Sequence, residues 1–262
     1  MSWHDLWVGV VVNIASAVAI GLAGFAWYQM ARRRRLAFFG LGGDADRVVV
    51  YASRLCIPRW TSLGPDSSRR SFEGVATPEY EAIKVADIQG FFGGLGRVWR
   101  TTGLRWGDIQ VKALIAPAAR EDVDREATLI TIGSPGYNVV SEMVEEQSDT
   151  LVRFANDNNN LAKRDKTVVG GADACFVQRL VSPATGQTIF WLAGPTKDGT
   201  TAAVDYLLRN WRKLSRRYRR DRSFCEVLRR TRSGYYVLME QFPTTEQRRV
   251  RGLASRSTPE DG

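Results

Sequence analysis

Histidine is almost absent from this chain of 262 residues. The single histidine, His4, precedes a long apolar run, so a histidine-based catalytic triad or a histidine-rich metal site is excluded from the rest of the chain. Cysteine is scarce as well. Cys56, Cys175 and Cys225 lack metal-ligand spacing, and an odd, sparse set argues against a disulfide framework. We therefore expect a reducing compartment, with no bound metal and no cofactor.

Charge is absent from the 25 residues between Leu6 and Met30. At about 1.5 Å per residue, a helix of this length exceeds the roughly 30 Å hydrocarbon core of a bilayer. Trp3 and Trp7 lie at one end and Trp27 and Tyr28 at the other, as in interfacial aromatic belts. A cleaved signal peptide carries its positive charge before the apolar run, and this chain carries it afterwards. The segment is therefore predicted to be a single transmembrane helix.

The flanking charges predict the orientation of this helix. Four arginines follow the apolar run, whereas only His4 and Asp5 precede it as charged or titratable residues. The positive-inside rule then places the N-terminus outside and the bulk of the chain in the cytosol, at the cell (inner) membrane. Anionic lipid headgroups are the expected partners of the arginines. The membrane-surface residues are Arg32, Arg33, Arg34 and Arg35.

Small residues recur within the apolar run. Ala17 and Gly21, like Ala19 and Ala23, have small-x-x-x-small spacing, and Asn13 adds an amide. Both features mediate helix–helix contacts in lipid, which predicts a homo-oligomer formed through the span. The alternative is that such spacings are frequent in any span rich in alanine and glycine.

The remaining chain alternates predicted strands and helices, which favours an α/β fold: a three-layer, Rossmann-like domain with a mixed sheet. Expected strands cover 48–53, 109–115, 128–133 and 151–155, and two hairpins pair 175–181 with 188–193 and 225–230 with 235–242. Expected helices begin near Thr77, near Ser134 or Asn138, and near Thr200. Polar loops are expected from 54 to 77 and from 156 to 166. The predicted parts are an N-terminal tail and anchor (1–30), a basic juxtamembrane linker (31–46), the α/β domain (47–243) and a disordered polar tail (244–262).

One loop nearly has the spacing of a phosphate-binding P-loop. In GPTKDGTT, Gly194 and Gly199 are five residues apart, and Thr200 and Thr201 follow. A P-loop needs a lysine directly after the second glycine, and Thr200 stands there. We do not expect a P-loop NTPase. A glycine-bounded loop that enters a helix still suits an anion. The alternative is a plain strand-to-helix turn with a threonine N-cap.

GSPGYN is another loop of this kind; it is the first of the two in chain order, and GPTKDGTT is the second. Gly133 ends a predicted strand, Ser134 and Pro135 lead towards a helix, and Asn138 is placed to touch a base or ribose. Open α/β sheets bind ligands at the carboxyl ends of their strands, so the two loops are expected to face one crevice. An ordinary Ser-Pro helix start is the alternative. The predicted ligand-binding residues are Gly133, Ser134, Asn138, Gly194, Gly199, Thr200 and Thr201.

The acids give no distinctive catalytic pair. Glu79, Glu81, Asp87, Glu142 and Asp198 are candidates, and none is paired with another by its spacing. Asp198, in the second loop, and Glu142, on the helix after GSPGYN, are the best placed for hydrolysis. Solvated surface charges are the alternative, and no catalytic residue is assigned.

The charge is distributed unevenly along the chain. Residues 206–251 hold fourteen Arg or Lys and four acids, whereas residues 119–165 hold ten acids and five bases. The basic segment includes an amphipathic helix whose arginines are either a solvated face or a contact with anionic lipid. No nucleic-acid reader motif accompanies it, so nucleic acid is not an expected partner.

The loop order resembles that of uncharacterised bacterial, actinobacterial-type Rossmann-like domains with G-[GS]-P-x-x-N and A-G-x-x-x-x-G-T-x-A-A loops. The matching residues are Gly133-Ser134-Pro135 with Asn138, and Ala193-Gly194 with Gly199-Thr200 and Ala202-Ala203. The resemblance covers roughly residues 47–242 and implies a nucleotide-like ligand, with no catalytic assignment.

These observations predict a single-pass membrane protein. Its cytosolic domain is expected to bind a small anionic, nucleotide-like ligand and to act as a sensor or interaction module rather than as an enzyme. One alternative is a membrane-tethered hydrolase acting on a nucleotide or an N-glycosidic bond. Another is a membrane scaffold that binds no ligand.

Overall fold

The structure is a computed structural model. It describes residues 3–41, 47–63, 69–93, 109–147, 149–155, 159–182, 185–218, 222–232, 234 and 236–242. The tail that the sequence predicts from residue 244 onward lies outside the described residues.

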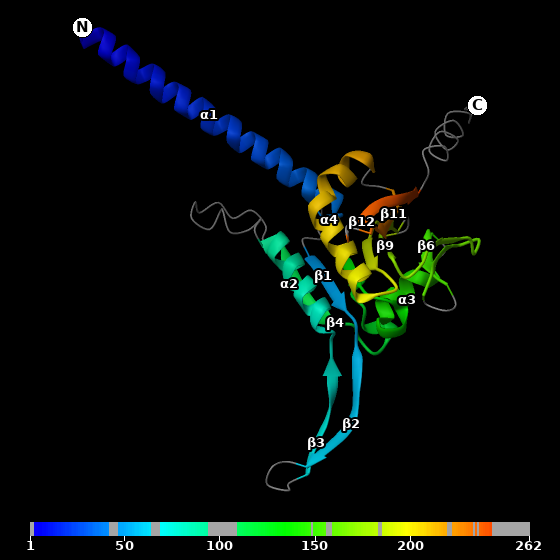
Figure 1. Cartoon of the computed structure of the whole chain (residues 1–262). Coiled ribbons are helices and arrows are strands. Elements are labelled where there is room, and N and C mark those ends of the chain that lie inside the picture. The colour runs from blue at the N-terminus through cyan, green and yellow to red at the C-terminus, as the bar shows by residue number, and fades with distance from the viewer. Residues whose placement is uncertain are drawn as a thin grey trace, which may run out of the picture.

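A mixed sheet forms the centre of the domain, as the sequence predicted, and it has seven strands (Figure 1). Its order is β12-β11-β9-β10-β5-β1-β4. The neighbours β10, β5, β1 and β4 are parallel, while β9, β11 and β12 join by antiparallel pairing. The strands are β1 (Arg47–Ala52), β4 (Gln110–Ile115), β5 (Thr128–Ile132), β9 (Ala174–Val181), β10 (Thr188–Ala193), β11 (Phe224–Arg230) and β12 (Tyr236–Phe242).

Helices and a small sheet cover the two faces of this sheet. Helices α2 (Glu79–Gly93) and α4 (Lys197–Arg217) pack on one face. Helix α3 (Val139–Glu146) packs on the other, beside a three-stranded sheet of β6 (Val152–Phe154), β7 (Leu161–Lys163) and β8 (Val168–Gly170).

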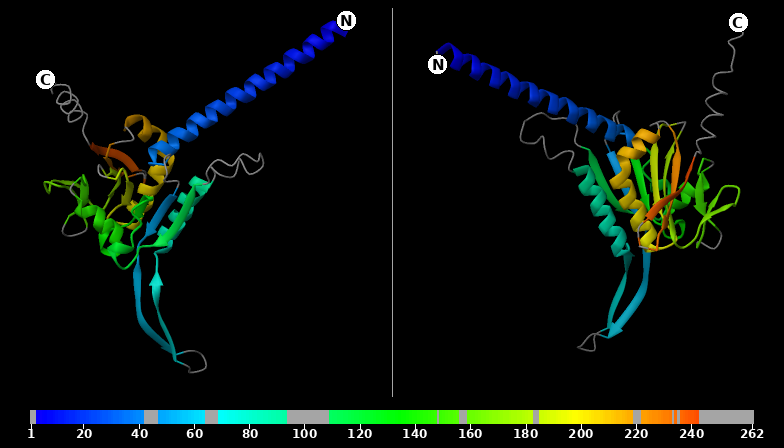
Figure 2. Two further views of the ribbon diagram at one scale, coloured as in Figure 1. Left: turned by 180° about the vertical axis from the view of Figure 1, so that it is seen from behind. Right: turned by 45° about the horizontal axis from the view of Figure 1, so that its top comes forward.

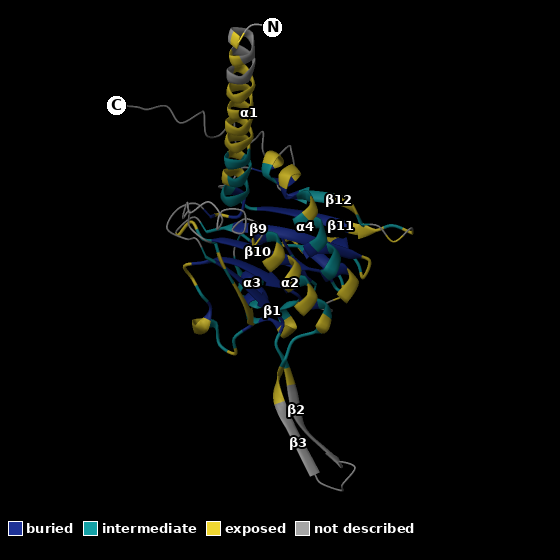
Figure 3. Ribbon diagram, turned by 90° about the vertical axis from the view of Figure 1, so that its left-hand side faces the viewer, coloured by how far each residue is buried: buried dark blue, intermediate teal, exposed yellow. Residues whose placement is uncertain are grey.

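The strand residues alternate between two apolar clusters. In β1, Val48 and Val50 face the α2–α4 side, while Val49 and Tyr51 face the α3 side. This is the two-residue period of a strand with both faces buried. Figure 3 shows the resulting dark blue strands at the centre of the domain, beneath helices that are exposed on their outer sides.

Helix α1 (Trp3–Phe38) projects from one end of the domain (Figures 1 and 2). Within the described residues it is the one helix long and apolar enough to cross a membrane, and its apolar window is not buried against the domain. Its length and composition fit either a membrane anchor or a signal sequence.

The carboxyl end of α1 belongs to the domain core. Residues 31–38, expected to be part of a linker, continue the helix, and Phe38, Phe39 and Leu41 are buried in the α2–α4 cluster. The helix ends because Gly40 adopts a positive φ of 72° while the amide of Leu41 donates to the carbonyl of Leu36. This is a Schellman motif, in which glycine avoids a side-chain clash. The helix and the domain are therefore joined through packed residues.

Two segments that the sequence predicted to be polar loops contain strands. In place of the loop at 54–77, β2 (Leu55–Leu63) and β3 (Arg69–Ala76) form an antiparallel hairpin that projects from the end of the domain opposite α1 (Figure 2). A ribbon that stands clear of the core needs no continuous apolar face, so the hydrophobic pattern did not reveal it. Strand β7 lies within the predicted loop at 156–166 and is held by pairing with its neighbours.

Gly40→Ala is expected to destabilise the protein by about 2–4 kcal/mol, because it adds overpacking to left-handed backbone strain. A Cβ at this position would collide with the Thr188 side chain. Gly186→Ala is the matched control, since Gly186 has a φ of 69° and open space around its Cβ position. It should cost only about 1 kcal/mol. Denaturant unfolding of the two variants measures the difference, and equal losses would contradict the packing argument.

Candidate functional site

The strands β1 and β5 are parallel neighbours, and the chain leaves them towards opposite faces of the sheet. The chain after β1 returns through α2 on one face, and the chain after β5 enters α3 on the other. Between the carboxyl ends of two such strands the loops separate, and open α/β sheets bind ligands at this position. The carboxyl ends of β1 and β5 are therefore the topological switch point of the sheet, and the topology identifies this position before any side chain is considered.

A cavity of about 280 Å³ lies at this switch point. Residues from both glycine-bounded loops line it: Ser134 and Tyr137 from the first, and Gly194, Lys197 and Thr200 among those from the second. The remaining lining residues come from the end of β1, the start of β2, the start of α2 and the second loop. They are Ser53, Leu55, Pro78, Tyr80, Glu81, Pro195 and Thr196. The two loops that the sequence singled out therefore face one crevice.

Glu81 places a buried carboxylate in this cavity, and it is only 1% exposed. Its Oε2 accepts a hydrogen bond from the Ser53 amide at 2.6 Å, and its Oε1 accepts one from Ser53 Oγ at 2.8 Å. Tyr80 donates its hydroxyl to Oε1 at 3.2 Å. Glu81 lies in the first turn of α2, where the helix dipole favours a negative charge. The carboxylate links the end of β1 to the start of α2.

Burial changes the acidity of this pair. Desolvation raises the pKa of Glu81 above its ordinary value, against the opposing effect of the hydrogen bonds from Ser53 and Tyr80. Desolvation also raises the pKa of Tyr80, to about 12, and the neighbouring Glu81 carboxylate adds to this shift. Glu81 was one of five candidate acids in the sequence, and its contacts with Ser53, 28 residues away, were not readable there.

Gly133 permits the close approach of the first loop to this carboxylate. Its φ is 96°, and a Cβ would lie 2.5 Å from Ser53 Oγ and 2.8 Å from Glu81 Oε1. Its carbonyl accepts hydrogen bonds from Trp191 Nε1 and Ser141 Oγ, both at 3.0 Å. A larger residue here would displace the Ser53–Glu81 pair.

Asn138 is buried and its side chain is fully engaged within the fold. Its Oδ1 caps α3 by accepting from the amides of Val140 and Ser141. Its Nδ2 donates to the carbonyls of Ile132 and Tyr51, which ties β5 to β1. The predicted ligand contact from Asn138 is thus a cap in the structure, and the residue does not line the cavity.

The second loop is shorter than the sequence predicted. Helix α4 begins at Lys197, with Thr196 as its N-cap accepting from the Gly199 amide, so Gly199, Thr200 and Thr201 already lie in the helix. A Cβ on Gly194 would lie 2.9 Å from Gly199 Cα, so these glycines let the end of β10 touch the first turn of α4. Thr200 Oγ1 bonds to the Gly194 backbone, and Thr201 does not line the cavity.

Three side chains at the rim remain available to a ligand. Ser134, Tyr137 and Lys197 line the cavity, and none of these side chains bonds to another described residue. Thr196 caps the amide of Gly199, and the amides of Lys197 and Asp198 before it lack intrahelical acceptors, so the positive end of that helix lies beside Lys197. The cavity thus has a cationic rim beside Lys197 and a carboxylate at Glu81.

The two acids favoured by the sequence lie elsewhere. Asp198 forms an exposed ion pair with Arg230 at 3.0 Å, and Glu142 forms one with Arg120 at 3.2 Å. Neither lines the cavity. Their surroundings are those of solvated surface pairs.

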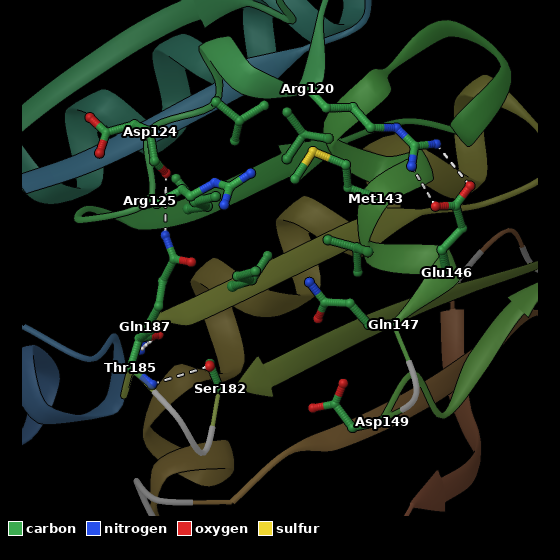
Figure 4. Close-up of a pocket in the computed structure, with 15 residues that line it drawn as sticks. Arg120, Asp124, Arg125, Met143, Glu146, Gln147, Asp149, Ser182, Thr185 and Gln187 are labelled. Atoms are coloured by element: carbon green, nitrogen blue, oxygen red, sulfur yellow. Dashed lines mark hydrogen bonds and ion pairs between the residues drawn. The ribbon is translucent and has the colours of Figure 1, made fainter.

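A larger cavity, of about 560 Å³, lies on the α3 side near the amino ends of β5 and β10 (Figure 4). Its floor is apolar, and Arg120 on its rim bonds to Glu146. Arg125 and Met143 extend over it in the close-up. None of the predicted site residues lines it, so the smaller cavity at the switch point is the candidate site.

Comparison with known proteins found no matching family model and no matching curated protein. Within the described residues, no group of three or more His, Cys, Asp or Glu is placed to hold a metal ion. The fold and the cavity define an α/β protein with a polar pocket at the switch point of a mixed sheet.

Glu81→Gln is expected to gain stability relative to the wild type as the pH rises above 4.5, the ordinary pKa of a glutamate. Because burial raises the pKa of Glu81, its contribution to stability is present below the ordinary value of 4.5 and is lost as the pH rises through the raised value. The variant stays neutral throughout and escapes this loss. Denaturant unfolding across this pH range measures the difference.

Glu146→Gln is the control with the opposite sign. The hydrogen bond from Arg120 lowers the pKa of Glu146, so the wild type should gain stability relative to this variant as the pH rises. Parallel pH dependences for the two variants would contradict the assignment of Glu81 as a desolvated carboxylate.

Proposed function

We propose that the chain is a single-pass membrane protein whose cytosolic domain, a three-layer Rossmann-like fold, binds a small anionic, nucleotide-like ligand at the cavity between β1, β5 and β10. The domain acts as a sensor or interaction module. The observation that carries this proposal is that both glycine-bounded loops line one cavity at the switch point.

The chemistry of the cavity fits a ligand with two different ends. A phosphate or other anion would lie against Lys197 and the first amides of α4, where the positive helix end favours it. A hydroxyl or amine, such as that of a ribose, would face Glu81, as an acidic residue does in dinucleotide-binding folds. Tyr137 is 60% exposed at the rim and offers a ring for stacking. The volume of about 280 Å³ suits a small ligand or part of a nucleotide.

The exposure and the packing of helix α1 support the proposal that it is a membrane anchor. The apolar side chains described between Val12 and Met30 face solvent rather than the domain, which a bilayer would relieve. A cleaved signal would remove the helix that leads into the core at Phe38 and Phe39. The cytosolic orientation rests on the arginines after the span. The positions with small-x-x-x-small spacing are exposed and free for self-association.

Glu81 also favours a second candidate, a membrane-tethered hydrolase of a nucleotide or N-glycosidic bond. A buried carboxylate with a raised pKa, in a cavity beside the Ser53 hydroxyl, is a candidate proton carrier, which neither Asp198 nor Glu142 provides. Turnover of bound nucleotide by the wild type, abolished in Glu81→Gln with binding retained, would favour this alternative.

Lys197→Met is expected to weaken nucleotide binding by about 10–100-fold, since it removes a charge-assisted contact. Isothermal titration of the full chain in detergent against nucleoside mono-, di- and triphosphates measures the affinity. Lys213→Met, at the other end of α4, is the matched control and should bind as the wild type does. If no nucleotide produces heat, the remaining candidate function is a membrane scaffold that binds no ligand.

Membrane fractions are expected to retain the uncleaved chain after alkaline carbonate extraction, and its measured mass should include the whole of α1. Ile20→Arg places a charge near the middle of the span, at a cost of about 2.5–3.5 kcal/mol, and should reduce retention. Arg232→Ile, a change on an exposed turn, is the control. A soluble product lacking the apolar run would identify α1 as a signal sequence instead.

A further inference from the structure

The end of the domain next to α1 carries a cluster of exposed cations. Two lie on the last turns of α1, four on the carboxyl half of α4 and one just before β11. They are Arg33, Arg34, Arg209, Arg212, Lys213, Arg216 and Arg222, and we call them the cationic end. Along α4 they recur at helical spacing on the side away from the core, where Trp211 and Leu214 are buried.

These cations are not neutralised within the described part of the chain. None of the seven side chains forms an ion pair or hydrogen bond there. The neighbouring Arg217, by contrast, pairs with the buried Glu226 at 2.6 Å. A cluster of like charges without counter-charges repels itself, and it is a natural surface for an anionic partner.

Contacts between α1 and α4 fix where this cluster lies. The guanidinium of Arg35 lies 4.7 Å from the ring centre of Phe91 and 4.8 Å from that of Trp211, so Arg35 packs on the domain and is not part of the surface. Arg212 lies over the same Trp211 ring at 5.5 Å. Arg35 is five residues beyond Met30, about 7.5 Å along the helix, which is comparable to the Debye length of about 8 Å.

We propose that the cationic end docks on the anionic surface of the bilayer that holds α1, and so fixes the orientation of the domain. This inference rests on the membrane anchor of the proposed function. The candidate cavity then faces away from the membrane, because it adjoins Lys197 at the opposite end of α4, about 22 Å from Arg212. The carboxyl half of α4 contacts lipid headgroups, and its amino end stays open to ligands from the cytosol.

The chain offers a convenient labelling scheme to test this. Cys56 is the one exposed cysteine among the described residues, while Cys175 and Cys225 are buried. In a Cys56→Ser background, Ser215→Cys places a single reactive thiol on α4 beside the cationic end. The full chain is labelled there with a fluorophore and reconstituted in vesicles whose headgroups carry an energy acceptor. Fluorescence lifetimes then give the ratio of docked to undocked domain.

In vesicles of phosphatidylcholine and phosphatidylglycerol the docked population is expected to dominate, and high salt should reduce it. Arg212→Gln, Lys213→Gln and Arg216→Gln together should lower the docked ratio by about 100-fold, since each cation near an anionic surface contributes a factor of about five. The matched control changes Lys112, Lys166 and Arg232 to Gln, three exposed cations away from the cationic end, and should leave the ratio unchanged.

Equal ratios in phosphatidylcholine alone and in the anionic mixture would overturn the proposal, and so would an equal loss in the control triple variant. Nucleic acid is the competing partner. Binding of a labelled RNA or DNA duplex through the same three residues, without a response to phosphatidylglycerol, would assign the surface to nucleic acid. Carbonate extraction distinguishes a failed anchor, which releases the chain, from failed docking, which leaves it membrane-bound.

Discussion

Arg179 carries its guanidinium into the interior of the domain with no exposed surface. It donates to the carbonyl of Phe38 at the end of α1 and to the carbonyl of Arg222 before β11, and it lies over the rings of Phe38 and Phe224. A buried charge is tolerable only while these acceptors stay in place. The Phe38 carbonyl is itself an acceptor that the end of α1 leaves open. One cation thus joins the long helix to the antiparallel part of the sheet.

The opposite end of the sheet, at the carboxyl ends of β1 and β5, depends on a buried carboxyl group. Glu81 joins the end of β1 to α2, and Gly133 brings the end of β5 against it. The glycines of the second loop bring β10 against α4 in the same way. These close contacts hold the walls of the cavity together, and Ser134, Tyr137 and Lys197 are left for a ligand.

Much of the fold could be read from the sequence, because buried parallel strands and amphipathic helices have strong periodic patterns. The central strands, α2, α3 and α4 were all predicted. The β2–β3 hairpin was missed because it stands clear of the core, and β7 because sheet pairing overrides a polar composition. The two loops were found by their glycines. The roles within them were not, since Asn138 is occupied by a cap and Glu81 becomes distinctive only beside Ser53, which is distant in sequence.

The unbroken passage of α1 into the core fixes a rotational phase between the apolar helix and the domain. Each residue turns an α-helix by about 100°, and no flexible joint lies between Met30 and Phe38 to absorb a mismatch. The direction in which Ala17 and Gly21 face is thereby set by the same packing that seats Phe38 and Phe39. Adding or removing one residue in the arginine segment would rotate the apolar part of the helix relative to the domain by more than a quarter of a revolution. The sequence of the apolar part itself would stay the same. The length of that segment is thus under geometric constraint as well as its charge.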